Sequence, residues 1–483
     1  MRVLLVASEV SPWVKTGGLA DVVGALPRAL ARMGGPDLEV ATLAPLYRQV
    51  RERAEREGPT LEDTGVVVRT HLDGRDETGR VRRAPGEPPV FFLEHDRYYD
   101  REGVYVNREG RDHADNAFRF AFLSQAVSSA AGFLGGPPDV VHCHDWQTGL
   151  LPVYLRHREN VACVLTIHNL AYQGWFGKDL LPRLGLDWSL FTMDQLEFYD
   201  QLNFLKAGIS FADAVTTVSP SYAGEIQTPE HGQALDGHLR GYAQARPLVG
   251  ILNGLDEAEW DPRTDPHLPA SFHAEDLTGK ARCREALLEE MGLPPGPQPL
   301  LGVVSRFAGQ KGLDLVAALG EQIAELDARL VVLGTGDPHL EDWFRGLSTD
   351  QAERVAARVE FDHGLAHRLV AGSDVLLVPS RFEPCGLTQL QAMAYGTVPV
   401  VHAVGGLKDT VHDPGDAALA RGEGTGFRFE GPTLQGLRWA TDRAVRLYRD
   451  DPEGWGRLVR ACMARDSSWD QAAVEYLRLF RSL

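Results

Sequence analysis

The chain has 483 residues, of which 43% are hydrophobic and 24% are charged, and its formal net charge is −18. This composition is typical of a soluble globular enzyme, and the length predicts two or three domains. The acidic balance argues against a nucleic-acid-binding surface or an anionic-membrane surface, because both need a basic face. No apolar run reaches the roughly 18 residues that a membrane-spanning helix requires.

The cysteines and the N-terminus indicate the compartment. The odd count of five cysteines without a CxxC pair predicts reduced thiols, no disulfide framework and no structural zinc site. The short apolar run at the N-terminus lacks the shape of a signal peptide, because Glu9 follows it at once. We therefore expect a cytoplasmic protein.

In the first half, short β-branched and apolar runs alternate with helical patterns. Such runs suit a parallel sheet covered on both faces, and the alternation predicts a doubly wound α/β fold. The expected strands are Val3–Ala7, Glu39–Leu43, Val90–Glu94, Asp139–His142, Ala162–Ile167, Ala214–Val218 and a last one within Pro247–Gly254.

A proline-containing connection at 261–298 precedes a second series of such runs. We predict a first domain at 1–250, a second at 251–467 and an amphipathic terminal helix at 468–483. Two doubly wound domains would place a ligand cleft at the carboxyl ends of both sheets. The expected strands of the second series are Leu300–Ser305, Arg329–Leu333, Val359–Asp362, Val375–Pro379, Val398–His402 and Gly426–Phe429.

After the first strand, Lys15, Gly17 and Gly18 precede a helical pattern that includes Asp21. Glycines allow close backbone approach to a ligand, and the free N–H groups of a helix start favour an anion. A tight turn with a solvated lysine would give the same pattern. The chain contains no GxxxxGK[ST] sequence, so P-loop chemistry is not indicated.

Two loops of the second domain carry charged side chains after strands. Arg306 and Lys311 follow the strand at 300–305, where fixed cations would suit a diphosphate leaving group, although surface cations are common in loops. Glu383 follows the strand at 375–379 and is either a helix-capping carboxylate or a group that contacts a sugar. The next residues, Gly386, Leu387 and Thr388, would offer backbone N–H donors to a phosphate. The thiol of Cys385 is best explained as a small buried side chain.

In the first domain, polar and aromatic residues again follow two strands, at Asp145 and Trp146 and at His168 and Asn169. Aromatic faces beside polar groups suit sugars. The nearby histidines match no known zinc spacing, so we predict no metal at this position.

These motifs together resemble the starch and glycogen synthase family, along almost the whole chain. The resemblance rests on KTGGLADV (15–22), HDWQTG (144–149), TIHNLAYQG (166–174), SRFAGQKG (305–312), FEPCGLTQ (382–389) and SWDQAAVEYL (468–477). Gln391 stands eight residues after Glu383, where the wider superfamily often has a second glutamate. Glycogen synthases generally lack that second acid, so Gln391 favours them over broader relatives.

The resemblance implies two facing Rossmann-like domains of the GT-B type, with the terminal helix packed on the first domain. It implies a retaining transfer of glucose to an α-1,4-glucan, with no essential metal or other cofactor. The sequence does not settle whether the donor is ADP-glucose or UDP-glucose. The family's bacterial-type motifs favour ADP-glucose.

The same resemblance assigns roles by position. It implies that Lys15 and Arg306 meet at one diphosphate when the domains close. The expected catalytic residues are His168, Glu383, Arg306, Lys311 and Asp145. The donor-binding residues are Lys15, Gly17, Gly18, Asp21, Arg306, Lys311, Cys385, Gly386, Leu387 and Thr388. The expected sugar or acceptor contacts are Tyr99 (in YYDREG), Asn169, Asn253 (in LNGLD) and Trp146.

Three alternatives remain open at this point. One is a nucleotide-sugar glycosyltransferase with a small acceptor, such as fructose or a lipid-linked sugar. Another is a phosphorylase, which would need a pyridoxal-phosphate lysine. The last is a non-catalytic glucan-binding protein, against which the missing signal peptide argues.

Overall fold

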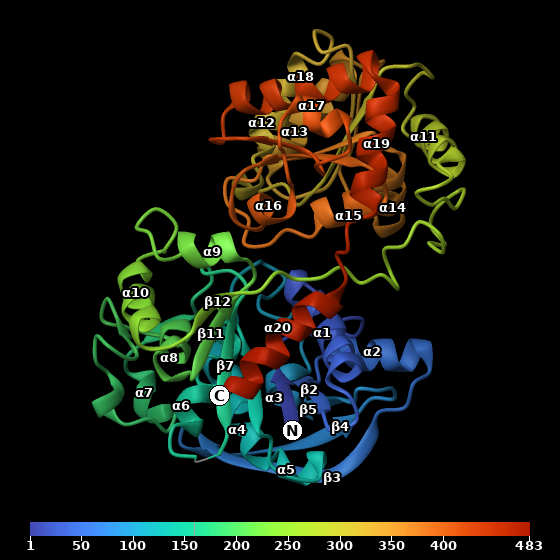
Figure 1. Cartoon of the computed structure of the whole chain (residues 1–483). Coiled ribbons are helices and arrows are strands. Elements are labelled where there is room, and N and C mark those ends of the chain that lie inside the picture. The colour runs from blue at the N-terminus through green and yellow to red at the C-terminus, as the bar shows by residue number, and fades with distance from the viewer. Residues whose placement is uncertain (159) are drawn as a thin grey trace. The chain divides into compact units, whose positions relative to one another are not determined.

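The computed structural model describes residues 1–158 and 160–483. By its internal contacts the chain divides into two compact units, of which unit 1 combines Met1–Gly254 with Trp469–Leu483 and unit 2 is Leu255–Ser468 (Figure 1). Among the described residues, no helix is long and apolar enough to cross a membrane.

The core of unit 1 is a nine-stranded sheet in which seven neighbouring strands are parallel. All seven coincide with strands expected from the sequence, apart from shifts of one or two residues at their ends. In sheet order they are β12 (Leu248–Gly250), β11 (Ala214–Thr217), β7 (Ala162–Ile167), β6 (Val140–His144), β1 (Arg2–Val6), β2 (Glu39–Pro45) and β5 (Val90–Glu94).

An antiparallel hairpin, β4 (Arg75–Arg83) and β3 (Glu62–Leu72), extends this sheet beyond β5. This hairpin was not expected from the sequence, because its strands are largely charged and lack a continuous apolar run. A local signal was present in the Asp73-Gly74 dipeptide, and both residues have the positive φ that a type I′ hairpin turn requires. A separate small sheet contains β8 (Trp175–Gly177), β10 (Gln201–Asn203) and β9 (Glu197–Phe198).

The first helix, α1 (Gly18–Gly34), buries the apolar face expected from its spacing, including Leu19, Val22 and Leu26. The acidic and basic run at 51–57 lies in α2 (Arg48–Glu57), where only Val50 and Ala54 are buried. The other helices of unit 1 before its last one are α3 (Asp96–Tyr99), α4 (Asn116–Ala126), α5 (Ala131–Leu134), α6 (Leu151–Leu155), α7 (Leu180–Arg183), α8 (Phe204–Phe211), α9 (Pro220–Glu225) and α10 (Asp236–Ala245).

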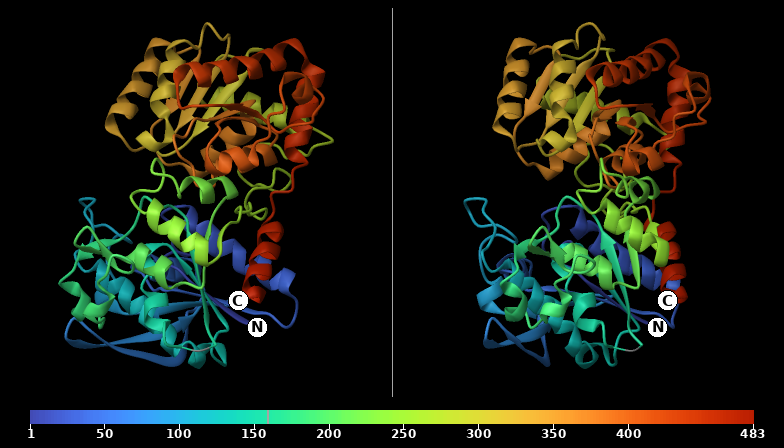
Figure 2. Two further views of the ribbon diagram at one scale, coloured as in Figure 1. Left: turned by 60° about the vertical axis from the view of Figure 1, so that its left-hand side comes forward. Right: turned by 90° about the vertical axis from the view of Figure 1, so that its left-hand side faces the viewer.

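The terminal helix α20 (Trp469–Ser482) packs beside α1, as Figures 1 and 2 show in red and blue. Tyr476 and Phe480 lie in the same buried cluster as Leu26 of α1 and Val3 of β1. Its amphipathic pattern is thus explained by burial against the first strand and helix of unit 1.

Unit 2 contains a six-stranded, all-parallel sheet with helices on both faces (Figure 2). The strand order is β15 (Val355–Arg358), β14 (Arg329–Leu333), β13 (Leu300–Val304), β16 (Val375–Val378), β17 (Val398–His402) and β18 (Phe427–Phe429). Its helices are α11 (Thr278–Glu290), α12 (Leu313–Glu321), α13 (Pro338–Asp350), α14 (His363–Gly372), α15 (Thr388–Ala394), α16 (Gly405–Thr410), α17 (Asp416–Ala420), α18 (Leu434–Asp450) and α19 (Pro452–Met463).

One expected strand of unit 2 was wrong. The strand was expected at 359–362, whereas β15 occupies 355–358. Val355 and Ala356 are buried in the sheet, and Asp362 instead caps α14 by accepting a hydrogen bond from the Leu365 backbone N–H at 2.8 Å. A side chain needed as a helix cap cannot continue the strand.

Candidate functional site

In unit 2, the charged loops after β13 and β16 are joined because these two strands are neighbours in the sheet. The Arg381 N–H donates to the Gln310 carbonyl at 2.8 Å, and the Gln310 side chain donates to the Phe382 carbonyl at 3.1 Å. Gly312 has φ +64°, and a Cβ there would lie 2.2 Å from the Pro379 carbonyl oxygen. The glycine therefore permits both the turn and the close approach of the two loops.

This approach brings Lys311 and Glu383 together. The Lys311 Nζ lies 2.6 Å from the Glu383 Oε2, and the Ser380 hydroxyl donates to the same oxygen at 2.9 Å. Glu383 is only 8% exposed, so its position is fixed by these two donors. A buried carboxylate held by a lysine and a hydroxyl is pre-organised, as groups that act on a substrate need to be.

Arg306, two residues after the end of β13 at Val304, differs from Lys311 in having no partner in the described part of the chain. Its side chain is exposed, and within residues 1–158 and 160–483 no hydrogen bond or ion pair of its guanidinium is found. Arg381, in contrast, is paired through both terminal nitrogens with Asp314. Arg306 is thus a cation available to an anionic ligand.

The backbone of the segment after Glu383 approaches two glycines at the start of α16 too closely for any side chain to fit there. A Cβ on Gly405 would lie 2.0 Å from the Glu383 carbonyl oxygen, and one on Gly406 would lie 2.1 Å from the Cys385 carbonyl oxygen. The Gly406 N–H donates to the Glu383 carbonyl at 3.1 Å. Cys385 is buried, while Gly386, Leu387 and Thr388 are half-buried at the start of α15.

In unit 1, the buried Glu9 carboxylate holds the loop at 15–18 through hydrogen bonds. This carboxylate is 2% exposed and accepts hydrogen bonds from the Thr16 hydroxyl at 2.7 Å, the Thr16 N–H and the Gly17 N–H at 3.3 Å. The Tyr105 hydroxyl also donates to it. Glu9 and Tyr105 were not expected at the site from the sequence; the available signal was an acidic residue in the loop shortly after a buried strand.

Lys15 and Asp21 form an ion pair across this loop, with the Lys15 Nζ 2.7 Å from the Asp21 Oδ1. Both side chains remain accessible, and Gly17 and Gly18 are exposed. An anionic ligand at this loop would therefore compete with Asp21 for the lysine, and surface ion pairs of this kind exchange at little cost.

Neighbouring strands β6 and β7 bring Asp145, His144 and His168 together. The Asp145 Oδ1 accepts the His168 backbone N–H at 2.7 Å, and the His144 Nδ1 lies 3.0 Å from the His168 Nε2. Asp145 has φ +56°, a left-handed conformation that strains a residue other than glycine. Such strain is often found at functional sites.

Burial shifts the pKa values of the histidines and of Asp145 in this cluster. It lowers the pKa of His168 to about 3 and of His142 to about 3, so both imidazoles are neutral at physiological pH. It also raises the pKa of Asp145 to about 7, against the opposing effect of the N–H donors of His168 and Asn169. A carboxyl group that titrates near neutrality suits proton transfer or charge sensing.

We expect Asp145→Asn to change how stability depends on pH. The folded-state pKa is raised from 3.8 to about 7, so the folded protein holds a proton that the unfolded chain loses between these values. This contribution is fully present below about pH 4 and is lost as the pH rises through about 7. The variant should therefore gain free energy of unfolding relative to wild type over this range, by up to a few kcal/mol.

Denaturant unfolding of both proteins at several pH values measures the effect. Asparagine tolerates the left-handed conformation, so the backbone is not an additional variable. The exposed Asp194→Asn serves as control and should show a constant difference from wild type. A pH-independent difference for Asp145→Asn would show that this carboxyl group does not titrate in the expected range.

The expected sugar contacts differ in their accessibility. Tyr99 is fully buried and its hydroxyl donates to the Arg119 carbonyl at 2.8 Å, so the structure gives it a packing role in place of the expected sugar contact. Trp146 is half-buried against Phe120, with ring centroids 5.1 Å apart. Asn169 Oδ1 accepts the Ala171 N–H at 3.0 Å, whereas the Asn253 Oδ1 is without a partner in the part of the chain that the structure describes.

Two family models match the chain. Residues 2–241 match the starch synthase catalytic domain, and residues 298–426 match the group 1 glycosyl transferases. A glycogen synthase from Anaeromyxobacter dehalogenans is 50% identical, with 100% of this chain and 99% of the relative covered. The chain belongs to the glycogen synthase family.

Further relatives agree with this membership. A glycogen synthase from Syntrophotalea carbinolica is 44% identical over 100% of this chain and 98% of its own length. The solved catalytic domain of starch synthase IV from Arabidopsis thaliana, bound to ADP and acarbose, superimposes with a TM-score of 0.88 at 33% identity. That match covers 99% of this chain and 98% of the other, so the two-domain GT-B fold expected from the sequence is confirmed.

Proposed function

We propose that this glycosyltransferase moves glucose from ADP-glucose to the non-reducing end of an α-1,4-glucan with retention of configuration. The relatives named above support the reaction, and the solved starch synthase contains ADP and acarbose. The observation that carries the proposal is the Lys311–Glu383 pair at 2.6 Å, with Arg306 in the same loop as Lys311 and without a partner among the described residues. Two cations on one loop, one of them fixed by a buried carboxylate, suit a diphosphate leaving group attached to a sugar.

In the proposed reaction, Arg306 and Lys311 bind the donor diphosphate and neutralise the negative charge that grows as the bond to glucose breaks. Glu383 holds Lys311 and faces the charge that develops on the sugar. Segment 385–388 is proposed to offer backbone N–H groups to the phosphates.

In unit 1, Lys15 and the exposed Gly17 and Gly18 are proposed to contact the same donor, with Asp21 releasing Lys15 to the phosphate. The neutral His168 is proposed to accept or donate a hydrogen bond at the glucose, and Asp145 to lie near the reacting carbon. Trp146, Asn169 and Asn253 remain proposed sugar or acceptor contacts.

The proposed mechanism is attack on the same face of the sugar within an oxocarbenium-like ion pair. The C1–oxygen bond to the diphosphate breaks, the acceptor oxygen bonds to C1, and the departing phosphate oxygen takes the acceptor's proton. A covalent glucosyl adduct on Glu383 or Asp145, found by mass spectrometry of enzyme quenched during turnover, would contradict this mechanism.

Transfer of radiolabelled glucose tests the overall reaction. We expect incorporation into glycogen from ADP-glucose, with a higher kcat/KM than from UDP-glucose in a direct competition of the two donors. Fructose and lipid-linked sugars should not accept glucose. Transfer to a small acceptor but not to glycogen would replace this proposal with the small-acceptor alternative.

We propose that the transfer needs no divalent ion, because Arg306 and Lys311 supply fixed positive charge for the diphosphate. Assays after extensive treatment with EDTA should then give an unchanged initial rate. A rate that disappears with EDTA and returns with Mg²⁺ would show that a metal carries part of this role.

Gly17→Ala probes the proposed approach of the loop to the donor. The backbone at Gly17 is extended, with φ −161°, and no atom lies within 4 Å of a Cβ placed there. The variant should therefore melt within about 0.5 kcal/mol of wild type, as surface substitutions usually do. If the diphosphate approaches this backbone, the added methyl group should raise the KM for ADP-glucose by about tenfold or more.

Gly241→Ala in α10 is a matched control, because its Cβ position is also free of atoms within 4 Å. It should leave the KM for the donor unchanged. An unchanged KM in Gly17→Ala as well would remove this loop from the proposed donor site.

We also propose a cytoplasmic location. The five cysteines are buried, and none forms a disulfide within the described residues, which suits a reducing compartment.

A further inference from the structure

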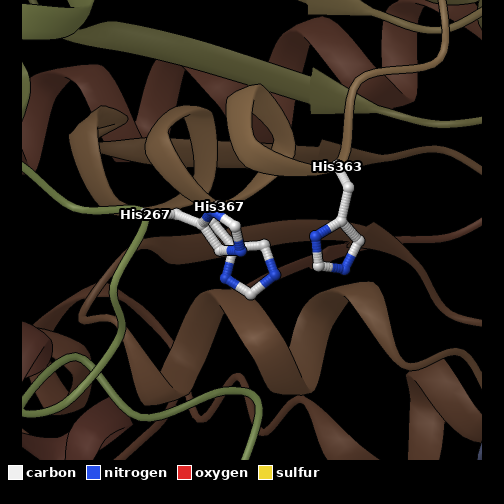
Figure 3. A group of neighbouring side chains, drawn as sticks. All are labelled: His267, His363 and His367. Carbon is white, nitrogen blue, oxygen red and sulfur yellow. The ribbon is translucent and has the colours of Figure 1, made fainter. Parts of the chain in front are cut away.

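Three histidines that take no part in the proposed reaction gather in unit 2. His363 and His367 lie on α14, and His267 lies in the segment that follows the boundary between the two units. Figure 3 shows the three imidazole rings side by side. Their ring centroids are 4.7–5.3 Å apart, and one nitrogen of each ring lies within 4.8 Å of the other two.

The spacing on the helix is the first indication of a metal site. Residues four apart lie on one face of a helix, and histidine pairs at this spacing bind zinc in metalloenzymes. The third imidazole comes from a separate segment, as is usual when a metal fastens two parts of a chain together. Imidazole nitrogens suit divalent zinc, copper and nickel.

The burial and orientation of His367 are the second indication. Its Nδ1 lies 2.7 Å from the Asp265 Oδ2, and Asp265 is itself held by the Tyr395 hydroxyl at 2.6 Å. His367 is 1% exposed, and its other nitrogen, Nε2, is buried without a hydrogen-bond partner. A buried imidazole that donates from one nitrogen to a carboxylate and leaves the other free is the arrangement found in metal-binding histidines.

His363 repeats this arrangement. Its Nε2 lies 3.0 Å from the Glu259 Oε1, which leaves Nδ1 for a ligand. Trp260 stacks on His367 with ring centroids 3.8 Å apart and keeps that ring in place. Two of the three imidazoles are therefore oriented by carboxylates, and the one that is buried is also fixed by stacking.

We propose that His267, His363 and His367 bind one zinc ion, with water as fourth ligand, and that the ion fastens the segment after the unit boundary to α14. Zinc–nitrogen bonds are about 2.1 Å long, so two nitrogens that share an ion lie no more than about 4.2 Å apart. His267 and His363 are exposed, and small rotations of their side chains close the remaining gap. The ion stabilises unit 2 and takes no part in the transfer of glucose.

Zinc binding to the full-length protein tests this inference. After dialysis against a chelator and then metal-free buffer, calorimetric titration with ZnCl₂ should show one site of micromolar affinity or tighter. Cobalt(II) should give the visible absorption of a four-coordinate complex. Zinc should also raise the midpoint of thermal unfolding, because it binds the folded chain.

The variants His267→Ala and His363→Ala change exposed side chains, so both should fold. Each should weaken zinc binding by about tenfold or more and remove the zinc-dependent rise in the unfolding midpoint. The exposed His339→Ala, in α13, is the matched control and should bind zinc as wild type does. Absence of binding to wild type, or equal binding to all four proteins, would overturn the inference.

Discussion

Arg306→Ala should lower kcat/KM for ADP-glucose by about 10²–10³-fold and leave the midpoint of thermal unfolding unchanged. Loss of one fixed group that stabilises developing negative charge has effects of this size. Stability should not change, because the guanidinium is exposed and forms no hydrogen bond or ion pair with any residue that the structure describes. Steady-state kinetics and a melting curve on the same preparation measure both quantities.

Two further variants separate geometry from charge. Arg306→Lys keeps the positive charge but loses the two-pronged donor, so it should recover only part of the lost activity. Arg282→Ala removes an exposed arginine of α11 and should behave as wild type. Activity close to wild type in Arg306→Ala would exclude this side chain from the donor site.

Glu383→Gln should reduce kcat by about 10²–10³-fold and also destabilise the protein by about 1–3 kcal/mol. The side chain keeps its volume, but it loses the charge that the Lys311 Nζ contacts at 2.6 Å. Because Glu383 is almost fully buried, the lysine is left without its partner, and its direction toward the proposed diphosphate is no longer fixed.

Lys311 and Glu383 should contribute to activity as one coupled pair. In a double-mutant cycle, Lys311→Ala combined with Glu383→Gln should lose much less activity than the product of the two single losses, since each change already disables the other group. Glu290→Gln is a matched control, because Glu290 pairs with Arg368 at 2.7 Å elsewhere in unit 2. The Glu290→Gln variant should lower stability without lowering kcat. Strictly multiplicative losses in the cycle would indicate that Lys311 and Glu383 act independently.

Local sequence patterns predicted much of the fold correctly. The seven parallel strands of unit 1 and the buried face of α1 follow from apolar runs and helical spacing, which depend only on near neighbours. The hairpin at 62–83 was missed because its strands are charged, and the strand at 355–358 was misplaced because Asp362 caps a helix. Both errors arose where a residue's role depends on what lies beside it in space.

The candidate site divides in the same way. The residue types and their places after strands were available from the sequence, and so was the family resemblance. The pairing of Lys311 with Glu383 was not available from the sequence, because it depends on β13 and β16 being neighbours in the sheet. The burial of Tyr99 and the role of Glu9 beneath the loop at 15–18 were likewise invisible.

The sequence by itself therefore determined the two doubly wound units, the motifs and the family. Only the tertiary structure decided which charges meet, which side chains are buried, and that His267 lies against His363 and His367. The physical reason is that apolar periodicity is set by residues a few positions apart. Contacts between loops are set by the order of strands in a sheet and by burial, which involve residues tens to hundreds of positions apart.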